Sequence, residues 1–190
     1  MAVIRVSGML GAGKTTFCKT LADSLKYTYL YTGGVLRDMA RERGLEIESF
    51  YQQLASDPDL ERSVDARQVA IMNQDWVVAE GRMAPFLPCI HPTVNMYLDV
   101  DESVAVERLR KRPEHATHSE DEVRTRLRQR LQDERTRYRD LYGIPDHLDR
   151  TKFDIVIDTT RLDASKVVFR GLQSLFRKIG FQLLLRHTHE

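Results

Sequence analysis

The stretch GMLGAGKTT, at residues 8–16, restricts the possible folds of this chain more than any other part of its sequence. It follows the apolar stretch VIRVS, which predicts a buried strand, and it leads into a helical pattern over Lys14–Leu25. Its glycines and the Lys-Thr pair match the spacing G-x-x-x-x-G-K-[ST] of a loop that holds nucleotide phosphates. The loop therefore predicts an α/β protein that binds a nucleotide.

The residue types in this loop each suit a role at the phosphates. Glycines let backbone N–H groups turn toward the ligand, and the N-terminus of the helix adds positive potential. Lys14 is expected to reach the β- and γ-phosphates, and the Thr15 hydroxyl to ligate Mg²⁺. The predicted nucleotide-binding residues are Gly8, Met9, Leu10, Gly11, Ala12, Gly13, Lys14, Thr15 and Thr16.

Five short apolar stretches alternate with helical patterns along the chain. Such alternation predicts a five-stranded parallel sheet with helices on both faces. The expected strands cover residues 3–7, 27–31, 76–79, 94–99 and 153–158. Two helical excursions, over about 35–72 and 112–142, are longer than a simple crossover requires and sit where a mobile lid or clamp would lie.

Composition narrows the class of protein. A chain of 190 residues with 42% hydrophobic and 30% charged residues fits one soluble domain, and a net charge of +1 argues against a generally nucleic-acid-coated protein. No apolar run reaches the ~20 residues of a membrane span, and no signal-peptide pattern opens the chain. Cys18 and Cys89 suggest neither a disulfide framework nor a metal motif, so we expect a cytoplasmic protein.

Two arginines follow neighbouring strands and suit an acceptor that carries a phosphate. Arg37 follows the second predicted strand and its TGG turn, and Arg82 follows the third strand. Ligands of open parallel sheets bind beyond the carboxyl ends of the strands, and a guanidinium holds an oxyanion bidentately. The pair favours a phosphorylated acceptor over a neutral hydroxyl.

Several separated motifs resemble the short, archaeal-type cytidylate kinases, a branch of the nucleoside monophosphate kinases. They are TGGVLRDMARERG, DPDLERSVDARQ, VVAEGRMA, RQRLQDERTRYRDLYGI and DIVIDTTRLDASKVV, and the likeness covers about residues 3–168. The resemblance implies a three-layer P-loop kinase domain over 1–178, with an NMP-binding segment at about 35–72 and a lid at about 112–130. Residues 179–190 form a tail beyond it.

The resemblance also implies an activity, which is transfer of the ATP γ-phosphoryl group to CMP or dCMP in the presence of Mg²⁺. The loop at residues 8–16 would bind ATP, and Arg37 and Arg82 would hold the acceptor phosphate. Arg128 and Arg130 match the lid arginines and would act with Lys14 on the transferring group. The expected partners are small molecules, without nucleic acid or membrane, and the expected assembly is a monomer or homodimer.

The remaining acceptor residues and the metal partner follow from position and from the resemblance. Glu80 and Asp99 each end an apolar strand and qualify as partner of Mg²⁺ and its waters, with Glu80 favoured. Pro85-Phe86 depart from the family pattern near the acceptor pocket, so the choice of base stays open. The other expected acceptor-binding residues are Gly33, Gly81 and the candidate cytosine readers Asp65, Arg67 and Gln68.

Two alternatives remain. One is a P-loop kinase for another nucleoside monophosphate or small phosphorylated acceptor. The other is a nucleotide-dependent nucleic-acid-binding protein that uses the arginine-rich helix at 119–142. Acids interleaved with these arginines, Glu122, Asp133 and Glu134 among them, instead favour a solvated helix.

We expect Lys14→Ala to abolish phosphoryl transfer and to leave the melting temperature unchanged, because Lys14 acts on phosphates from a solvent-accessible loop. A coupled ADP-release assay and thermal unfolding measure the two effects. Unchanged turnover in the variant would refute the kinase interpretation.

Overall fold

The computed structural model describes residues 3–115 and 117–180. Most of the expected tail, residues 181–190, therefore lies outside the described residues. The described strands are β1 (Val3–Gly8), β2 (Thr28–Tyr31), β3 (Val77–Glu80), β4 (Thr93–Asp99) and β5 (Ile155–Asp158). The helices are α1 (Lys14–Leu25), α2 (Thr32–Glu42), α3 (Ile47–Ser56), α4 (Pro58–Met72), α5 (Glu102–Arg110), α6 (Glu120–Tyr142) and α7 (Ala164–Ile179). Single 3₁₀ turns cover Ala84–Phe86, Pro113–His115 and Arg150–Lys152.

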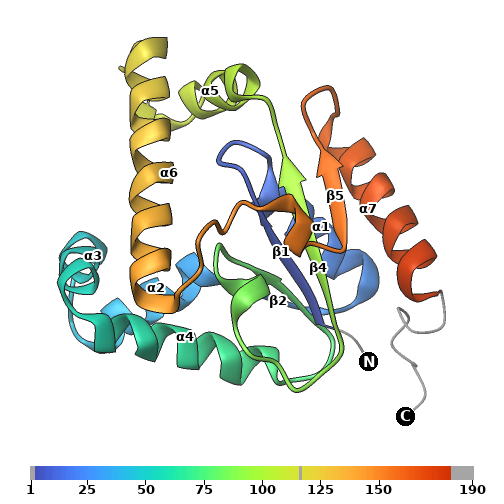
Figure 1. Ribbon diagram of the computed structural model, residues 1–190, viewed down its shortest axis with the longest axis horizontal. Coiled ribbons are helices and arrows are strands. Elements are labelled where there is room, and N and C mark those ends of the chain that lie inside the picture. The colour runs from blue at the N-terminus through green and yellow to red at the C-terminus, as the bar shows by residue number, and fades with distance from the viewer. Residues whose placement is uncertain (1–2, 116, 181–190) are drawn as a thin grey trace.

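The five strands form one parallel sheet in the order β2-β3-β1-β4-β5, at the centre of the molecule (Figure 1). Strand β1 is buried along its whole length and pairs with β3 on one side and β4 on the other. The expected sheet is thus confirmed. Since the strands all point one way, the loops after β1, β2 and β3 meet at the same edge.

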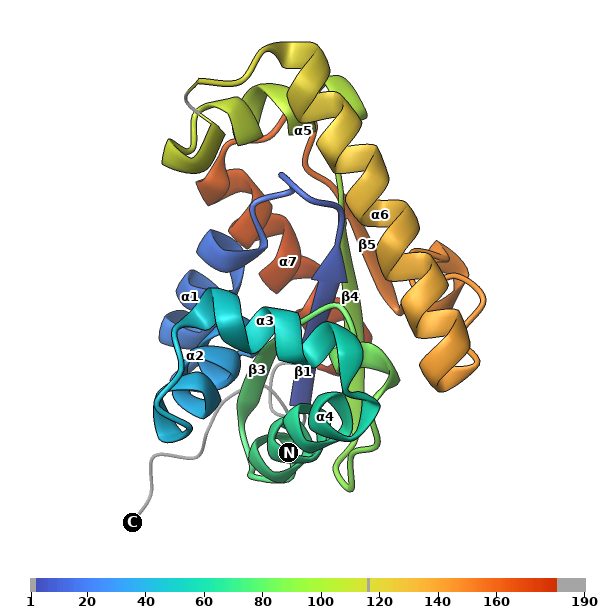
Figure 2. The same cartoon turned by 90° about the vertical axis from the view of Figure 1, so that its left-hand side faces the viewer.

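Helices cover both faces of the sheet and form two apolar cores. Alternate residues of β1 enter different cores: Ile4 and Val6 join α1, α5 and α7, whereas Val3 joins α2, α3 and α4. Helix α6 contributes Leu127 to the first core and Tyr138 to the second. Seen from the side in Figure 2, α6 runs along one edge of the molecule. No helix among the described residues is long and apolar enough to cross a membrane.

The ends of α4 and α6 follow local sequence rules. Asp57 caps α4 through its side chain, with Pro58 at the first helical position. Ser119 and Glu122 form a capping box before α6, and Gly143 ends that helix at a φ of 67°. These signals fix the bounds of the long helix that carries most of the arginines.

The expected turn at TGG is wrong, because α2 begins at Thr32, directly after β2, rather than at about residue 35. Glycine costs little in a first turn, where the N–H groups lack intrahelical partners in any case. A Cβ on Gly33 would lie 2.5 Å from the Tyr31 ring, so glycine also permits this close approach. The early start brings the N-terminus of α2 to the sheet edge.

Candidate functional site

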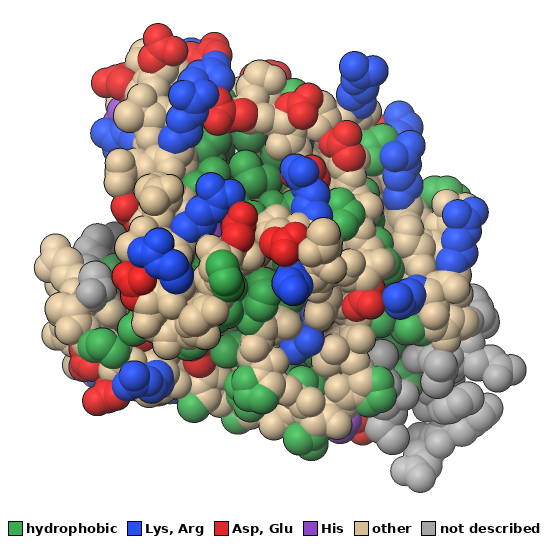
Figure 3. All heavy atoms as spheres, in the orientation of Figure 1, with side chains coloured by type: hydrophobic (Ala, Val, Ile, Leu, Met, Phe, Trp, Pro, Cys, Tyr) green, Lys and Arg blue, Asp and Glu red, His purple; other side chains and the backbone are tan. Residues whose placement is uncertain are grey.

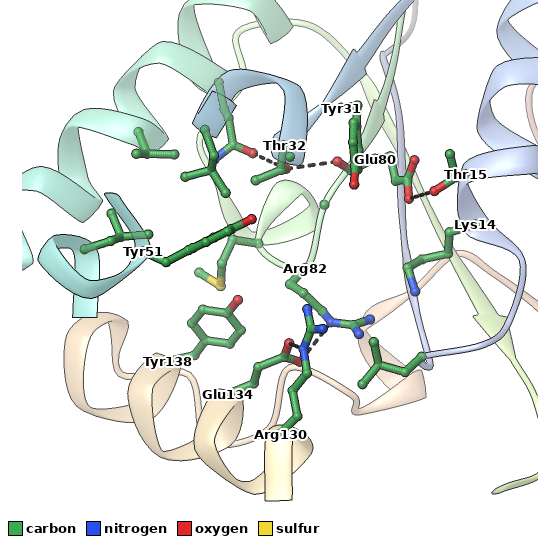
Figure 4. A pocket seen from close by; sticks show the side chains of 18 of the residues that line it. Lys14, Thr15, Tyr31, Thr32, Tyr51, Glu80, Arg82, Arg130, Glu134 and Tyr138 are labelled. Carbon is green, nitrogen blue, oxygen red and sulfur yellow. Dashed lines mark hydrogen bonds and ion pairs between the residues drawn. The ribbon is translucent and has the colours of Figure 1, made fainter. Parts of the chain in front are cut away.

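A cavity of about 460 Å³ opens at the carboxyl edge of the sheet, within the size range of small-molecule sites. Its walls come from the loop after β1, the start of α2, helices α3 and α4, the segment after β3, and α6. Figure 4 looks into it, with Lys14 and Thr15 at one end and Tyr51 at the other. The cavity thus joins the predicted nucleotide loop to the predicted acceptor side.

The loop after β1 has a backbone that glycine alone fits. Gly8 has a φ of 143°, and a Cβ there would lie 2.1 Å from the carbonyl oxygen of Leu98 on β4. Lys14 donates from Nζ to the carbonyl oxygens of Gly8 and Met9, at 3.0 and 2.7 Å. Burial, and then the positive charge of Arg82, lower the pKa of Lys14. A bound anion would offset both effects, because it interacts favourably with the charged ammonium group.

Glu80, at the end of β3, lies beside Thr15. Thr15 donates from Oγ1 to Glu80 Oε1 at 2.8 Å, and the Tyr29 hydroxyl donates to Oε2. Asp99 instead forms an ion pair with Arg150, at 2.5 Å. Of the two candidate metal partners, only Glu80 therefore contacts the loop. No group of three or more His, Cys, Asp or Glu side chains within the described ranges could itself hold a metal ion.

A chain of polar contacts joins α2, β3 and α4 at the acceptor side. Thr32 Oγ1 lies 2.6 Å from Gln68 Oε1 and 2.9 Å from the carbonyl oxygen of Glu80. Gln68 Nε2 donates to Asp65 Oδ1 at 3.1 Å. Gly81 leaves room for Thr32, since a Cβ there would lie 2.3 Å from Thr32 Oγ1. Burial raises the pKa of Asp65, although contacts with Tyr142 and Arg137 act the other way.

Two of the arginines in the cavity share one carboxylate. Glu134 on α6 accepts from Arg82 Nε at 2.9 Å and from Arg130 Nε at 3.1 Å (Figure 4). Arg82 also donates to the carbonyl oxygen of Gly8, and His147 Nε2 lies 3.5 Å from Glu134. Burial alone would raise the pKa of Glu134, but the contacts with His147, Arg82 and Arg130 lower it to about 2. Glu134 therefore stays ionised and is buried, contrary to the expectation of a solvated position.

Six predicted site residues do not line the cavity: Gly8, Met9 and Ala12 of the phosphate loop, and the arginines Arg37, Arg67 and Arg128. Arg37 is exposed, donates to the Gly33 carbonyl at 2.9 Å and lies over the Tyr31 ring. Arg67 forms two bonds of 2.6 Å with Glu42, and Arg128 pairs with Glu102 at 2.7 Å. Arg37 thus bonds within its own helix, whereas Arg67 and Arg128 bond to acids of other helices, and these last two pairings do not follow from sequence spacing.

Sequence reasoning missed several residues that line the cavity, namely Tyr31, Thr32, Tyr51, Glu134, Arg137 and Tyr138. The helical periodicity of α6 does indicate that Glu134 is buried. Val123, Leu127, Glu134 and Tyr138 are the buried residues of that helix, so a carboxylate occupies a position on its apolar stripe. A buried acid on such a stripe needs a charged partner.

A second hollow, of about 280 Å³, lies on the other side of the loop after β1. It is lined by Gly13 and Thr16 at the start of α1 and by the apolar side chains of Phe17 and Val167. Arg108 borders it and donates to the Thr159 carbonyl at 2.8 Å. This hollow lies beside the phosphate loop and suits the flat ring of a nucleotide base.

Comparisons with known proteins agree with these features. Residues 4–141 match the family described as an AAA domain. The cytidylate kinase of Pyrococcus abyssi is 34% identical over 180 residues, covering 93% of this chain and 97% of the relative. That of Pyrococcus furiosus is 35% identical over 159 residues, covering 84% and 80%. The solved shikimate kinase from Bacteroides thetaiotaomicron superposes with a TM-score of 0.62 at 21% identity, over 93% of this chain and 98% of that one, which confirms the fold.

The buried Glu134 makes part of the stability depend on pH. Its pKa in the folded protein, about 2, lies below the ordinary value of 4.5. Its contribution is therefore complete above about pH 4.5 and is lost as the pH falls toward 2. Over this window we expect the free energy of unfolding to fall by on the order of 3 kcal/mol more in the wild type than in Glu134→Gln.

Urea unfolding of both proteins between about pH 6 and pH 2 measures the difference. Parallel pH dependences in the two proteins would contradict the ionised, charge-paired state of Glu134.

Proposed function

The chain belongs to the cytidylate kinase family of P-loop kinases, and from this premise we propose that it transfers the γ-phosphoryl group of ATP to CMP or dCMP. The products are ADP and CDP or dCDP. The observation that carries the proposal is the single cavity of about 460 Å³ lined by Lys14 and Thr15 at one end and by Arg82, Arg130 and Arg137 beyond them. A phosphate donor and a phosphate-bearing acceptor need such groups within one enclosure.

On the donor side, the loop at residues 8–16 binds the phosphates of ATP through its backbone N–H groups and the N-terminus of α1. Lys14 exchanges its carbonyl contacts for the β- and γ-phosphates, whose charge is compatible with a buried ammonium group. The hollow of about 280 Å³ next to Gly13 and Thr16 takes the adenine ring.

The neighbouring oxygens of Thr15 and Glu80, 2.8 Å apart, fit Mg²⁺, which prefers hydroxyl, carboxylate and water ligands. When bound there, the ion would neutralise charge on the β- and γ-phosphates. Thr15 would serve as a direct ligand, and Glu80 would hold the hydroxyl and the coordinated waters.

In the transfer itself, a phosphate oxygen of CMP attacks the γ-phosphorus of ATP, and the bond from that phosphorus to the bridging oxygen of ADP breaks. The electron pair stays on the β-phosphate oxygen, and the ionised acceptor needs no base. Positioning and charge neutralisation therefore supply most of the rate. Arg82 holds the acceptor phosphate, and Arg130 reaches the transferring group. Arg37 and Arg128 would join them if the segments around the cavity close over both substrates, which would also exclude water.

Asp65 and Gln68 are the residues best placed to read the acceptor base, and Gly33 and Gly81 line the same cavity. A carboxylate accepts a hydrogen bond from the N4 amine of cytosine, a group that uracil lacks. The contacts with Thr32 and Tyr142 fix the orientation of the two side chains. Tyr51 projects from α3 into the same end of the cavity (Figure 4) and offers a face for stacking. Arg67 pairs with Glu42 in this structure, so it would contact the base only in a closed state of the protein.

This assignment treats α2–α4, about 35–72, as the NMP-binding segment and about 112–130 as the lid of one domain over 1–178.

The arginines of α6 support a kinase over a nucleic-acid-binding protein, because most of them face acids. Figure 3 shows basic and acidic side chains interleaved on the face that it draws. The ion pairs are Arg124–Glu102, Arg128–Glu102, Arg130–Glu134, Arg135–Asp146, Arg137–Glu61 and Arg139–Asp140.

We expect CMP and dCMP to be preferred over UMP, AMP and GMP, with little discrimination between ribose and deoxyribose. A site that hydrogen-bonds a base edge rejects a base lacking the matching groups by up to ~10⁴–10⁵-fold, whereas shape alone gives about 10²-fold. Coupled ADP release against a panel of monophosphates gives kcat/KM for each. An AMP or GMP value equal to that of CMP would refute cytidine specificity and leave phosphoryl transfer standing.

Arg82→Lys and Arg37→Ala should each raise the KM for CMP and lower kcat, with little change in ATP affinity, since both act on the acceptor phosphate. The effect should be larger for Arg82, which is 12% exposed and lines the cavity. Arg41→Ala is the matched control, because Arg41 lies on the same helix as Arg37 and pairs with Asp38 at the surface. Loss of ATP affinity with normal acceptor kinetics would place the acceptor elsewhere.

A further inference from the structure

His147 is a buried polar side chain that the proposed reaction does not use. It lies in the loop between α6 and β5 and is 0% exposed. Its ring packs edge-on against Tyr138, with centroids 4.9 Å apart. Neither ring nitrogen has a hydrogen-bond partner of standard geometry within the described residues, yet Nε2 lies 3.5 Å from Glu134 Oε2. A buried imidazole in such surroundings requires a physical reason.

Glu134 is the group that His147 approaches, and it joins two elements of the cavity. Both bonds to arginine use the inner Nε nitrogens, of Arg82 after β3 and of Arg130 on α6. The outer nitrogens of these arginines are therefore not occupied by the carboxylate. Removal of the carboxylate would leave two guanidinium groups beside each other without a shared counter-charge.

We propose that His147 is a positioning residue for phosphoryl transfer: it fixes Glu134 from the buried side, and Glu134 holds Arg82 and Arg130 in the orientation that binds the phosphates. Nε2 is the ring nitrogen that faces the carboxylate, and an N–H at that atom would point toward Glu134 Oε2. The packing against Tyr138 fixes the plane of the ring. The inference rests on the proposed function, since it assigns a purpose to the arginine pair.

The electrostatics of the cluster agree with this arrangement. The contact with His147 is one of the causes that keep the pKa of Glu134 low despite its burial. Glu134 in turn balances the charge of both arginines, which lie close to Lys14 in the same cavity. A carboxylate that is held rigidly keeps the arginines ordered before any substrate binds, so less ordering is required at the reaction step.

Steady-state kinetics of His147→Leu and His147→Gln test the proposal. We expect His147→Leu to lower kcat/KM for CMP by about tenfold, the scale of one hydrogen bond to a charged group, and to leave the ATP affinity unchanged. His147→Gln keeps an N–H donor and should lie within about twofold of the wild type. The double variant Glu134→Gln/His147→Leu should be no worse than Glu134→Gln alone, because both changes act through one carboxylate.

The matched control is Arg5→Met. Arg5 is also buried and bonded, to Asn95 and to the Leu87 carbonyl, but it lies toward the amino end of the sheet. This variant should lose thermal stability and keep the wild-type KM for CMP. If His147 had a purely structural role, His147→Leu would also lose thermal stability and keep the wild-type KM for CMP. That result would overturn the proposal.

A second readout needs no substrate. The Nε–H proton of Arg82 is bonded to Glu134, so its exchange with water is slowed. Nitrogen-15 NMR should show exchange about tenfold faster in His147→Leu than in the wild type and in His147→Gln. Unchanged exchange of this proton in His147→Leu would overturn the positioning role. So would a double variant in which the effects of Glu134→Gln and His147→Leu on kcat/KM for CMP multiply. The proposed function fails separately, if the wild type leaves CMP unphosphorylated.

Discussion

All five strands of the sheet run in one direction, so their carboxyl ends meet along one edge, and this constraint places every part of the site. The loop after β1 approaches β4 so closely that Gly8 has no room for a Cβ beside the Leu98 carbonyl. The next strand, β3, ends at Glu80 against Thr15 and continues into Arg82. The proposed nucleotide loop, metal partner and acceptor arginine are therefore neighbours because the strands beneath them are paired.

The second organising feature is the balance of charge in the cavity. Lys14, Arg82, Arg130 and Arg137 gather there before any phosphate is bound. Glu134 offsets much of this charge and is itself held ionised by its neighbours. Such an arrangement orders both arginines through their Nε nitrogens, so the carboxylate itself does not occupy their outer nitrogens. Glu134 also ties α6 to the segment after β3, because it bonds Arg82 there as well as Arg130 on its own helix.

The sequence was enough for the elements and for the phosphate loop, because these depend on local signals. Periodicity gave the five strands, and Asp57, Ser119 and Gly143 marked helix ends by their own backbone requirements. The orientation of long charged side chains depends instead on partners distant in the chain. Arg67 faces Glu42 and Arg128 faces Glu102, and neither pairing follows from helical spacing. The contact of His147 with Glu134 likewise arises from the loop after α6 folding back across the sheet.

The central claim is that one cavity brings a nucleotide donor and a phosphate acceptor together for direct transfer. Incubation of the protein with CMP and ATP labelled at the γ-phosphorus tests this claim most directly. Direct transfer predicts that the label appears in CDP, mole for mole with ADP, and that little inorganic phosphate forms while CMP is present. Release of the label as inorganic phosphate, at a rate independent of CMP, would contradict the account.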